Sequence, residues 1–242
     1  MLNKDLIKDF WNKRAEVDDS RLATQLSEDG SFMYDKKLVE IYLNKGDVML
    51  DLGCGTGTLI NEVKEIADYI VGVERENKLA SRVVKRKNID VVIQDVLQFE
   101  SEQKFDLITV IGVINYLDDQ ELNMLLTNIQ KLLKSNGKII FKQQSGVKET
   151  VVINNYSEEL KTEYSAIYRH WQKEKNIFEN YFTVEEIIDV YPEENNKWDN
   201  THHFAYILSN NKEKVEKEYH FNDYGEFRGT RSLEKLIKNE KL

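Results

Sequence analysis

Three acidic residues follow consecutive apolar segments of the chain, where carboxylates could bind the hydroxyl and amino groups of a nucleoside. Asp51 ends the segment that begins at Val48, Glu74 ends the next one, and Asp95 follows a third. An acid about 20 residues beyond a glycine-rich turn, at the tip of a second strand, can accept hydrogen bonds from ribose hydroxyls. The spacing predicts a site for a nucleoside-containing cofactor, although each acid taken alone could also be solvated or form a turn.

The loop after Asp51 predicts a close approach between backbone and ligand. Positions 53–57 read GCGTG, and residues of helical spacing follow from Thr58. Glycine allows positive φ and leaves room for a ligand against the backbone, and the N-terminus of the following helix offers unpaired N–H groups. The dinucleotide fingerprint G-x-G-x-x-G would place a third glycine at position 58, where this chain has Thr58. A tight turn without a ligand is the alternative.

The elements that position these residues are expected to alternate between strands and helices. Apolar runs predict strands at 48–51, 69–73, 89–93, 105–111, 138–142, 183–190 and 203–208, the last two forming an antiparallel hairpin. Helical spacing predicts helices at 4–17, 32–43, 76–84 and 120–134, the last stopped by Ser135-Asn136-Gly137. Residues 143–181 are polar and helical in tendency, and longer than a single crossover helix requires.

Composition narrows the classes of function. A net charge of -9 argues against generic nucleic-acid binding, which needs a basic surface. The one cysteine, Cys54, allows neither an internal disulfide nor a cysteine-based zinc site. The N-terminus lacks a signal-peptide core, and no apolar run approaches the roughly 20 residues of a membrane span. We therefore expect a soluble cytoplasmic protein, a monomer or a homodimer, with no bound metal.

The spacing D-x-G-x-G-x-G from Asp51 to Gly57 resembles motif I of the class I S-adenosylmethionine-dependent methyltransferases. The resemblance implies a doubly wound, Rossmann-like sheet of seven mostly parallel strands with an antiparallel last strand, and a helical N-terminal lid. It implies one domain over residues 1–242: a lid (1–45), a cofactor-binding core (46–142), an acceptor-pocket segment with the final strands (143–210) and a charged tail (211–242). It also implies S-adenosylmethionine as the methyl donor and S-adenosylhomocysteine as the product.

The same resemblance implies two sets of binding residues. Those expected at the cofactor, where Asp95 and its apolar neighbours would hold the adenine, are Trp11, Arg21, Asp51, Gly53, Cys54, Gly55, Gly57, Glu74, Arg75, Gln94, Asp95, Val96 and Ile111. Those expected at the acceptor, drawn from the lid and from the carboxyl ends of the later strands, are Arg14, Tyr34, Asn115, Tyr116, Lys142, Gln144, Tyr168 and Arg169.

Methyl transfer from a sulfonium requires little beyond positioning the acceptor and excluding water. A hydroxyl acceptor also needs a general base, whereas an anionic oxygen does not. His202 and His203 begin a predicted strand, so alternation should point one of them inward as a candidate base. His170, beside Trp171, is a weaker candidate.

The expected acceptor is a small, polar, anionic molecule. The chain lacks the N/D-P-P-Y phrase associated with amide and base-amine methylation, and the metal-ligand pattern of catechol-type enzymes. The phrases FWNKRA, FKQQSG and YPEENNKWDNTH resemble methyltransferases of bacterial surface-polysaccharide clusters, some of which serve O-methyl phosphoramidate modification of capsules. This implies metal-independent O-methylation, with Arg14, Arg21, Lys142 and Arg169 facing the anion.

Three other interpretations stay open. One is N-methylation of a small amine, which an acid in the pocket would favour over a paired arginine. Another is a nicotinamide dehydrogenase, which Thr58 disfavours. The third is a non-catalytic partner subunit with the same fold, against which the intact Asp51, Glu74 and Asp95 argue.

Overall fold

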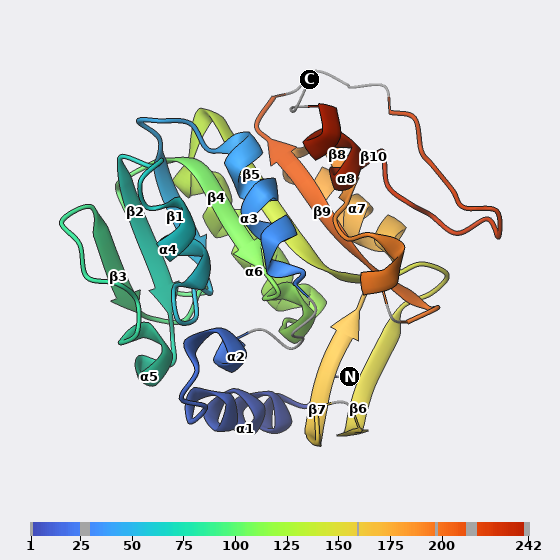
Figure 1. Cartoon of the computed structure of the whole chain (residues 1–242), viewed down its shortest axis with the longest axis horizontal. Helices are drawn as coiled ribbons and strands as arrows, with labels where there is room; N and C mark the ends of the chain where they lie inside the picture. The colour runs from blue at the N-terminus through green and yellow to red at the C-terminus, as the bar shows by residue number, and fades with distance from the viewer. Residues whose placement is uncertain (1, 25–29, 159, 197, 212–216, 240–242) are drawn as a thin grey trace.

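The central sheet has the strand order β10-β8-β9-β5-β4-β1-β2-β3 (Figure 1). The computed structural model describes residues 2–24, 30–158, 160–196, 198–211 and 217–239, so residues 25–29 of the expected lid and parts of the expected tail lie outside the description. The strands are β1 Val48–Leu52, β2 Tyr69–Glu74, β3 Ile89–Ile93, β4 Phe105–Ile111, β5 Leu133–Gly146, β8 Thr183–Asp189, β9 Thr201–Ser209 and β10 Arg231–Ser232.

Strand direction confirms the predicted fold class. β9 is antiparallel to both of its neighbours, β5 and β8, and every other pairing in this sheet is parallel. The result is a mostly parallel Rossmann-like sheet with one antiparallel strand and a helical N-terminus. The number of strands in this sheet is eight and not the expected seven, because the two residues of β10 add a short edge strand beside β8.

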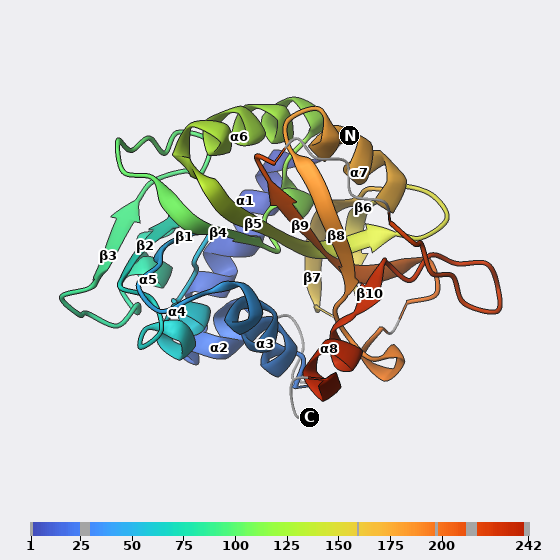
Figure 2. The same cartoon turned by 90° about the horizontal axis from the view of Figure 1, so that it is seen from above.

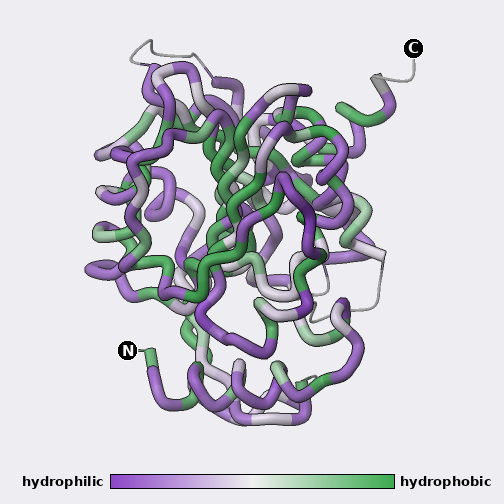
Figure 3. The backbone as a smooth tube through the Cα atoms, turned by 90° about the vertical axis from the view of Figure 1, so that its left-hand side faces the viewer, coloured by the Kyte–Doolittle hydropathy of each residue, from purple (hydrophilic) through white to green (hydrophobic). Residues whose placement is uncertain are grey.

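Helices cover both faces of the sheet (Figure 2). The helices α6 Asp119–Leu132 and α7 Trp171–Glu179 lie on one face, and α3 Phe32–Tyr42, α4 Thr58–Val63 and α8 Leu233–Asn239 lie on the other. Strand alternation divides the core accordingly: Leu50 and Leu52 pack in the cluster that contains α6, whereas Met49 packs with α3 and α4. Figure 3 shows these apolar strands running through the middle of the molecule.

The helix α6 ends earlier than predicted. Asp118 and Glu121 form a capping box at its start, each side chain accepting from the other residue's backbone N–H. Leu133 already has extended backbone and enters β5, so the expected stop at 135–137 is wrong. Gly137 is required there for another reason: a Cβ at this position would lie 2.9 Å from the carbonyl oxygen of Phe105.

The segment between β5 and α7 is a β-hairpin and not the helical stretch that the sequence predicted. The strands β6 Val151–Ser157 and β7 Thr162–Tyr168 pair antiparallel and form a separate two-stranded sheet. β6 is mostly exposed, and its sequence VVINNYS runs from three apolar residues into mostly polar ones, without the alternation that identifies a half-buried strand. Only Tyr164, Ser165 and Ala166 in the middle of β7 are buried.

Two N-terminal helices join this hairpin to the glycine-rich loop. The helix α1 Lys4–Ala15 lies along β7 (Figure 1), where the Phe10 and Tyr164 rings are 5.1 Å apart and Asn3 N–H donates to Ser165 Oγ. The short helix α2 Ser20–Thr24 follows, and Thr56 Oγ1 donates to its Ser20 carbonyl at 2.7 Å. Both helices therefore lie at the carboxyl ends of the central strands.

The remaining elements are short. They are the helix α5 Asn77–Ala80 and the 3-10 helices η1 Ile114–Tyr116 and η2 Glu193–Asn195. None of the helices in the described residues combines the length and apolar character that crossing a bilayer requires.

Candidate active site

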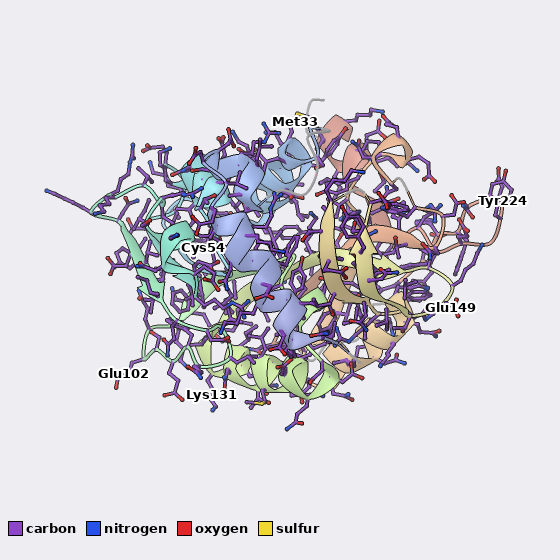
Figure 4. The ribbon with its side chains drawn as sticks, turned by 90° about the horizontal axis from the view of Figure 1, so that it is seen from below. Met33, Cys54, Glu102, Lys131, Glu149 and Tyr224 are labelled. Carbon is purple, nitrogen blue, oxygen red and sulfur yellow. The ribbon has the colours of Figure 1, made fainter. Side chains whose placement is uncertain are left out.

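A cavity of about 600 Å³ lies at the carboxyl ends of β1, β2, β4 and β5. Its walls include the loop after β1, the turn after β3, and residues of α1, α3 and β7. Figure 4 shows α1 crossing in front of this end of the sheet, with Cys54 of the glycine-rich loop beside it. In an open α/β sheet this edge is where ligands bind.

Asp51 and Glu74 place two buried carboxylates in the cavity wall. Asp51 accepts a 2.7 Å hydrogen bond from Thr109 Oγ1, and burial raises the pKa of Asp51 to about 6. Glu74 accepts from the backbone N–H groups of Gly55 and Glu76, at 3.0 and 2.8 Å, and burial raises its pKa as well. A cationic or hydroxyl-bearing ligand would relieve the cost of burying both groups.

The glycine-rich loop is held by the second strand. The N–H groups of Gly53 and Cys54 donate to the Val73 carbonyl at 2.8 and 3.0 Å, and the N–H of Gly55 is bonded to Glu74. These three N–H groups are therefore paired within the protein; the expectation of unpaired N–H groups concerned the N-terminus of α4. Glycine at position 55 allows α2 to pack closely against the loop, because a Cβ at Gly55 would lie 2.5 Å from the Thr24 methyl group of α2.

The turn after β3 brings a third acid to the cavity. Asp95 Oδ1 accepts from Leu97 N–H at 2.9 Å, and its carboxylate lies 4.0 Å from the Arg75 guanidinium. Asp95 thus forms a turn and also lines the cavity, together with Gln94 and Val96. The two expectations for this residue are compatible.

A buried ionic cluster surrounds Lys142 of β5. Lys142 Nζ is 3.1 Å from the Asp35 carboxylate and donates to the Tyr191 hydroxyl, which donates to Asp35 at 2.9 Å. The Lys142 and Asp35 side chains are only 9% and 12% exposed. The His203 ring stands 4.9 Å from the Tyr191 ring, and all four residues line the cavity.

Sequence reasoning missed Asp35 and Tyr191. Asp35 shares the buried face of α3 with Leu38 and Val39, three and four positions on. An acid on the apolar face of an amphipathic helix is a signal for a buried partner, and it could have been found. Tyr191 follows β8 in a polar loop and gave no comparable signal.

The cavity brings together most of the residues expected at a site. Those in its wall are Trp11, Asp51, Gly53, Cys54, Gly55, Glu74, Arg75, Gln94, Asp95, Val96, Ile111, Asn115, Tyr116, Lys142, Gln144, Tyr168 and His203. Those that do not line it are Arg14, Arg21, Tyr34, Gly57, Arg169, His170 and His202.

Arg169 and His202 were predicted to face the acceptor, but their contacts hold both side chains away from the cavity. The Arg169 guanidinium is fully buried and donates to Asp119 and to the carbonyls of Ile114 and Leu117, so it ties η1 to α6. His202 Nε2 lies 2.6 Å from Asp189 Oδ1 on the opposite face of β9 from His203. Neither side chain can reach an acceptor in the cavity.

The other displaced residues have local roles. Arg14 Nε donates to the Ala23 carbonyl at 3.1 Å, and the Arg21 guanidinium lies 5.9 Å from the Phe32 ring centre. Tyr34 packs against Tyr191. His170 precedes α7 beside Trp171, and Gly57, with φ of 72°, precedes α4.

Acidic side chains outnumber basic ones in the cavity wall. The acids are Asp5, Asp35, Asp51, Glu74, Glu76, Asp95 and Glu121. The basic residues are Lys4, Lys8, Arg75 and Lys142, of which Lys4 pairs with Glu121, Lys142 with Asp35, and Arg75 with Glu76 and Asp95. Within the described ranges no group of histidine, cysteine and acidic side chains has the arrangement of a metal site.

Comparisons with known proteins agree with this geometry. The family model described as "Methyltransferase domain" matches residues 43–217. Among curated relatives, a probable (S)-tetrahydroprotoberberine N-methyltransferase 2 of Papaver bracteatum is 30% identical over 88 residues, which are 33% of this chain and 25% of the relative. Nodulation protein S of Rhizobium tropici is 31% identical over 97 residues, 38% of this chain and 41% of the relative. The chain thus spans less than half the length of these curated relatives.

Solved structures share the fold at low identity. Phosphoethanolamine N-methyltransferase 1 of Haemonchus contortus, in complex with phosphoethanolamine and S-adenosylhomocysteine, superposes with a TM-score of 0.68 at 18% identity, covering 88% of this chain and 51% of that one. The N-methyltransferase NodS of Bradyrhizobium japonicum with S-adenosylhomocysteine gives 0.63 at 16% identity, covering 87% of this chain and all of that one.

Proposed function

The chain belongs to the methyltransferase-domain family, and from that premise we propose that it transfers the methyl group of S-adenosylmethionine to a small-molecule acceptor. The observation that carries the proposal is the pair of buried carboxylates, Asp51 and Glu74, beside the glycine-rich loop in one cavity. A sulfonium nucleoside with a free amino group matches this pair, because it offers a cation and two ribose hydroxyls.

In the proposed complex, each part of the cofactor has a partner of suitable chemistry. Glu74 accepts hydrogen bonds from the ribose hydroxyls, and ionised Asp51 pairs with the ammonium group of the methionine portion. The adenine lies by Asp95 and Val96, with the carboxylate accepting from its amino group. The loop at 53–55 supports the methionine portion, where a side chain would collide with Thr24 or Val113.

The transfer needs no redox partner. A lone pair of the acceptor forms a bond to the methyl carbon while the carbon–sulfur bond breaks, and sulfur keeps the electron pair of the broken bond as the neutral thioether of S-adenosylhomocysteine. The protein holds the reacting atoms in line and excludes water. We propose that the acceptor lies between the cofactor and the Lys142–Asp35–Tyr191 cluster, where His203 can accept a proton from it.

A nitrogen acceptor fits the cavity better than an anionic oxygen. Carboxylates outnumber basic groups in the wall, and the three arginines named for a phosphate lie outside it. The N-methyltransferase name of the Papaver bracteatum relative points the same way. O-methylation of a phosphate-bearing metabolite in capsule biosynthesis is the second candidate. The observation that favours it is the Lys142 ammonium in the cavity wall. To bind a phosphate, this ammonium would have to leave its ion pair with Asp35.

Two measurements test the proposal. Calorimetry of the purified protein with S-adenosylhomocysteine tests the cofactor site, and absence of binding would refute the proposal. Methyl-labelled S-adenosylmethionine is then incubated with size-fractionated cell extract. Label in small molecules retained on a cation exchanger supports an amine acceptor. Label retained on an anion exchanger supports the phosphate-bearing candidate, and label in macromolecules would refute a small-molecule acceptor.

A further inference from the structure

Four aromatic side chains from three distant segments line one part of the cavity. They are Trp11 of α1, Tyr116 of η1, and Tyr164 and Tyr168 of β7. The ring centroids of Trp11 and Tyr116 are 5.4 Å apart at an interplanar angle of 85°, and those of Tyr116 and Tyr164 are 6.2 Å apart at 90°. We call these four residues the aromatic cage.

Hydrogen bonds hold the rings of the aromatic cage in place. The hydroxyl oxygens of Tyr116 and Tyr164 are 3.0 Å apart, and the Tyr168 hydroxyl donates to that of Tyr164 at 3.4 Å. Burial raises the pKa of Tyr116, so its phenol stays neutral. Tyr164 is anchored from behind by the edge of the Phe10 ring. The rings are therefore arranged before any ligand arrives, which lowers the entropy lost on binding.

Aromatic rings that line a cavity are suited to a substituted ammonium group, through the faces that no neighbouring ring edge covers. The faces of tryptophan and tyrosine carry partial negative charge and attract a cation within about 6 Å of the ring centre. Alkyl groups on the nitrogen also gain contact with the rings, which a strongly hydrated inorganic cation or a phosphate does not. The excess of carboxylates over the cavity wall as a whole favours a cation, against the nearby Arg14 guanidinium, which interacts with Tyr116.

We propose that the aromatic cage binds the substituted ammonium group of the acceptor, so that the substrate class is a small aliphatic amine. This inference rests on the proposed function and specifies its acceptor. The acceptor nitrogen attacks as a neutral amine, having passed its proton to His203 or to solvent water if it arrived protonated, and gains positive charge as the methyl carbon leaves sulfur. Rings that stabilise that charge stabilise the transition state more than the neutral amine.

The competing roles for the same rings lie within the cofactor. They could stack on its adenine, or face its sulfonium. These roles differ in measurable ways, because S-adenosylhomocysteine keeps the adenine but has no sulfonium charge. Adenine stacking predicts that losing a ring weakens both nucleosides, and sulfonium contact predicts that it weakens S-adenosylmethionine alone.

The test uses choline and 3,3-dimethylbutan-1-ol, which have the same shape but differ in charge. Each is titrated calorimetrically into the protein saturated with S-adenosylhomocysteine. We expect choline to bind roughly tenfold or more tightly than the alcohol, in the range of a desolvated cation–π contact. Tyr168→Leu and Trp11→Leu should weaken the binding of choline by roughly tenfold. Tyr168→Phe and Trp11→Phe keep a ring and should retain most of the affinity for choline.

Several results would overturn the inference. They are equal affinity for choline and the alcohol, no binding of choline, or equal losses in the phenylalanine and leucine variants. A parallel loss of S-adenosylhomocysteine or of S-adenosylmethionine affinity in the leucine variants would assign the rings to the cofactor instead. Failure of the unchanged protein to bind S-adenosylhomocysteine is a different outcome, because it removes the proposed function itself. Tyr168 is only partly buried, so its variants are the ones expected to fold without difficulty.

Discussion

The cofactor half and the acceptor half of the cavity are assembled in opposite ways. The cofactor half comes from the ends of the neighbouring strands β1, β2 and β3, and its residues contact one another across short stretches of chain, as Gly55 and Glu74 do at a separation of 19. The acceptor half joins Asp35 to Lys142 and Tyr191, at separations of 107 and 156. The first half is built mainly from neighbouring strands of one sheet, and the second joins segments from distant parts of the chain.

This difference suggests that variants should divide cleanly between the two halves. A change in the acceptor half should alter methyl transfer and stability but spare nucleoside binding. A change in the cofactor half should weaken nucleoside binding, and transfer only through that loss, while sparing stability. Four predictions test this division, in order of expected size.

Lys142→Met should give the largest effect, on stability and transfer together. It leaves the buried Asp35 carboxylate without its cation, which costs about 3 kcal/mol of unfolding free energy. Denaturant unfolding measures that loss, and labelled S-adenosylmethionine measures the fall in transfer. The double variant Lys142→Met with Asp35→Leu should recover the stability but not the transfer. A large loss of S-adenosylhomocysteine affinity in the double variant would break the division.

Glu74→Ala should lower the affinity for S-adenosylhomocysteine by about 100-fold, because it removes charge-assisted hydrogen bonds to the ribose. It also leaves the Gly55 and Glu76 N–H groups without their acceptor, so loop geometry contributes to the loss. Calorimetry gives the affinity. Asp90→Ala, on the neighbouring strand and bonded to Tyr69, is the matched control that should bind normally. Unchanged affinity in Glu74→Ala would place the nucleoside elsewhere.

The affinity for S-adenosylhomocysteine should fall about tenfold between pH 7 and pH 5. The pKa of Asp51 is raised to about 6, so the carboxylate that pairs with the ammonium group is mostly protonated at pH 5. Binding at pH 5.5 should release protons, which calorimetry in two buffers of different ionisation enthalpy detects. Asp51→Asn should bind weakly at both pH values and lose the proton release. If that variant kept the pH dependence, another group would be responsible.

Glu174→Gln should have the smallest effect and touch neither half. Glu174 is buried behind β5, accepts from Ser145 and Gln143, and has its pKa raised to about 7 by burial. A raised folded-state pKa adds stability at low pH that is lost as the pH rises through 7. Between pH 6 and pH 8 the unchanged protein should lose about 1 kcal/mol from this group. The variant should show a flatter profile in thermal unfolding, with unaltered nucleoside affinity.

The same contrast explains what the sequence could predict. The bounds of β3 and β4 were predicted as the structure has them, because short apolar runs between polar residues identify buried strands. The opposite orientations of His202 and His203 followed from strand alternation, although the sequence could not say which one faces the cavity. The acids after β1, β2 and β3 meet at one edge because parallel strands end together.

The acceptor half could not be predicted in this way. The partners of Lys142 lie on α3 and after β8, and no local pattern states that these segments meet. Arg169 was misassigned because a cation near aromatic residues looks alike in sequence whether it binds a ligand or buried carbonyls. The β6–β7 hairpin was missed because an exposed hairpin needs no apolar periodicity.

The hydrogen bond from Thr56 to Ser20 has a consequence for how fast the spent nucleoside is replaced by a fresh one. It fastens α2 to the loop on which the cofactor is proposed to lie, and the Thr24 methyl group fills the space beside Gly55. A nucleoside seated there would contact both the loop and the N-terminal helices, so this hydrogen bond would add to the barrier for its entry and departure. Residence time and equilibrium affinity are then governed by different residues. Departure of the spent nucleoside, rather than the displacement at carbon, would set the ceiling on turnover.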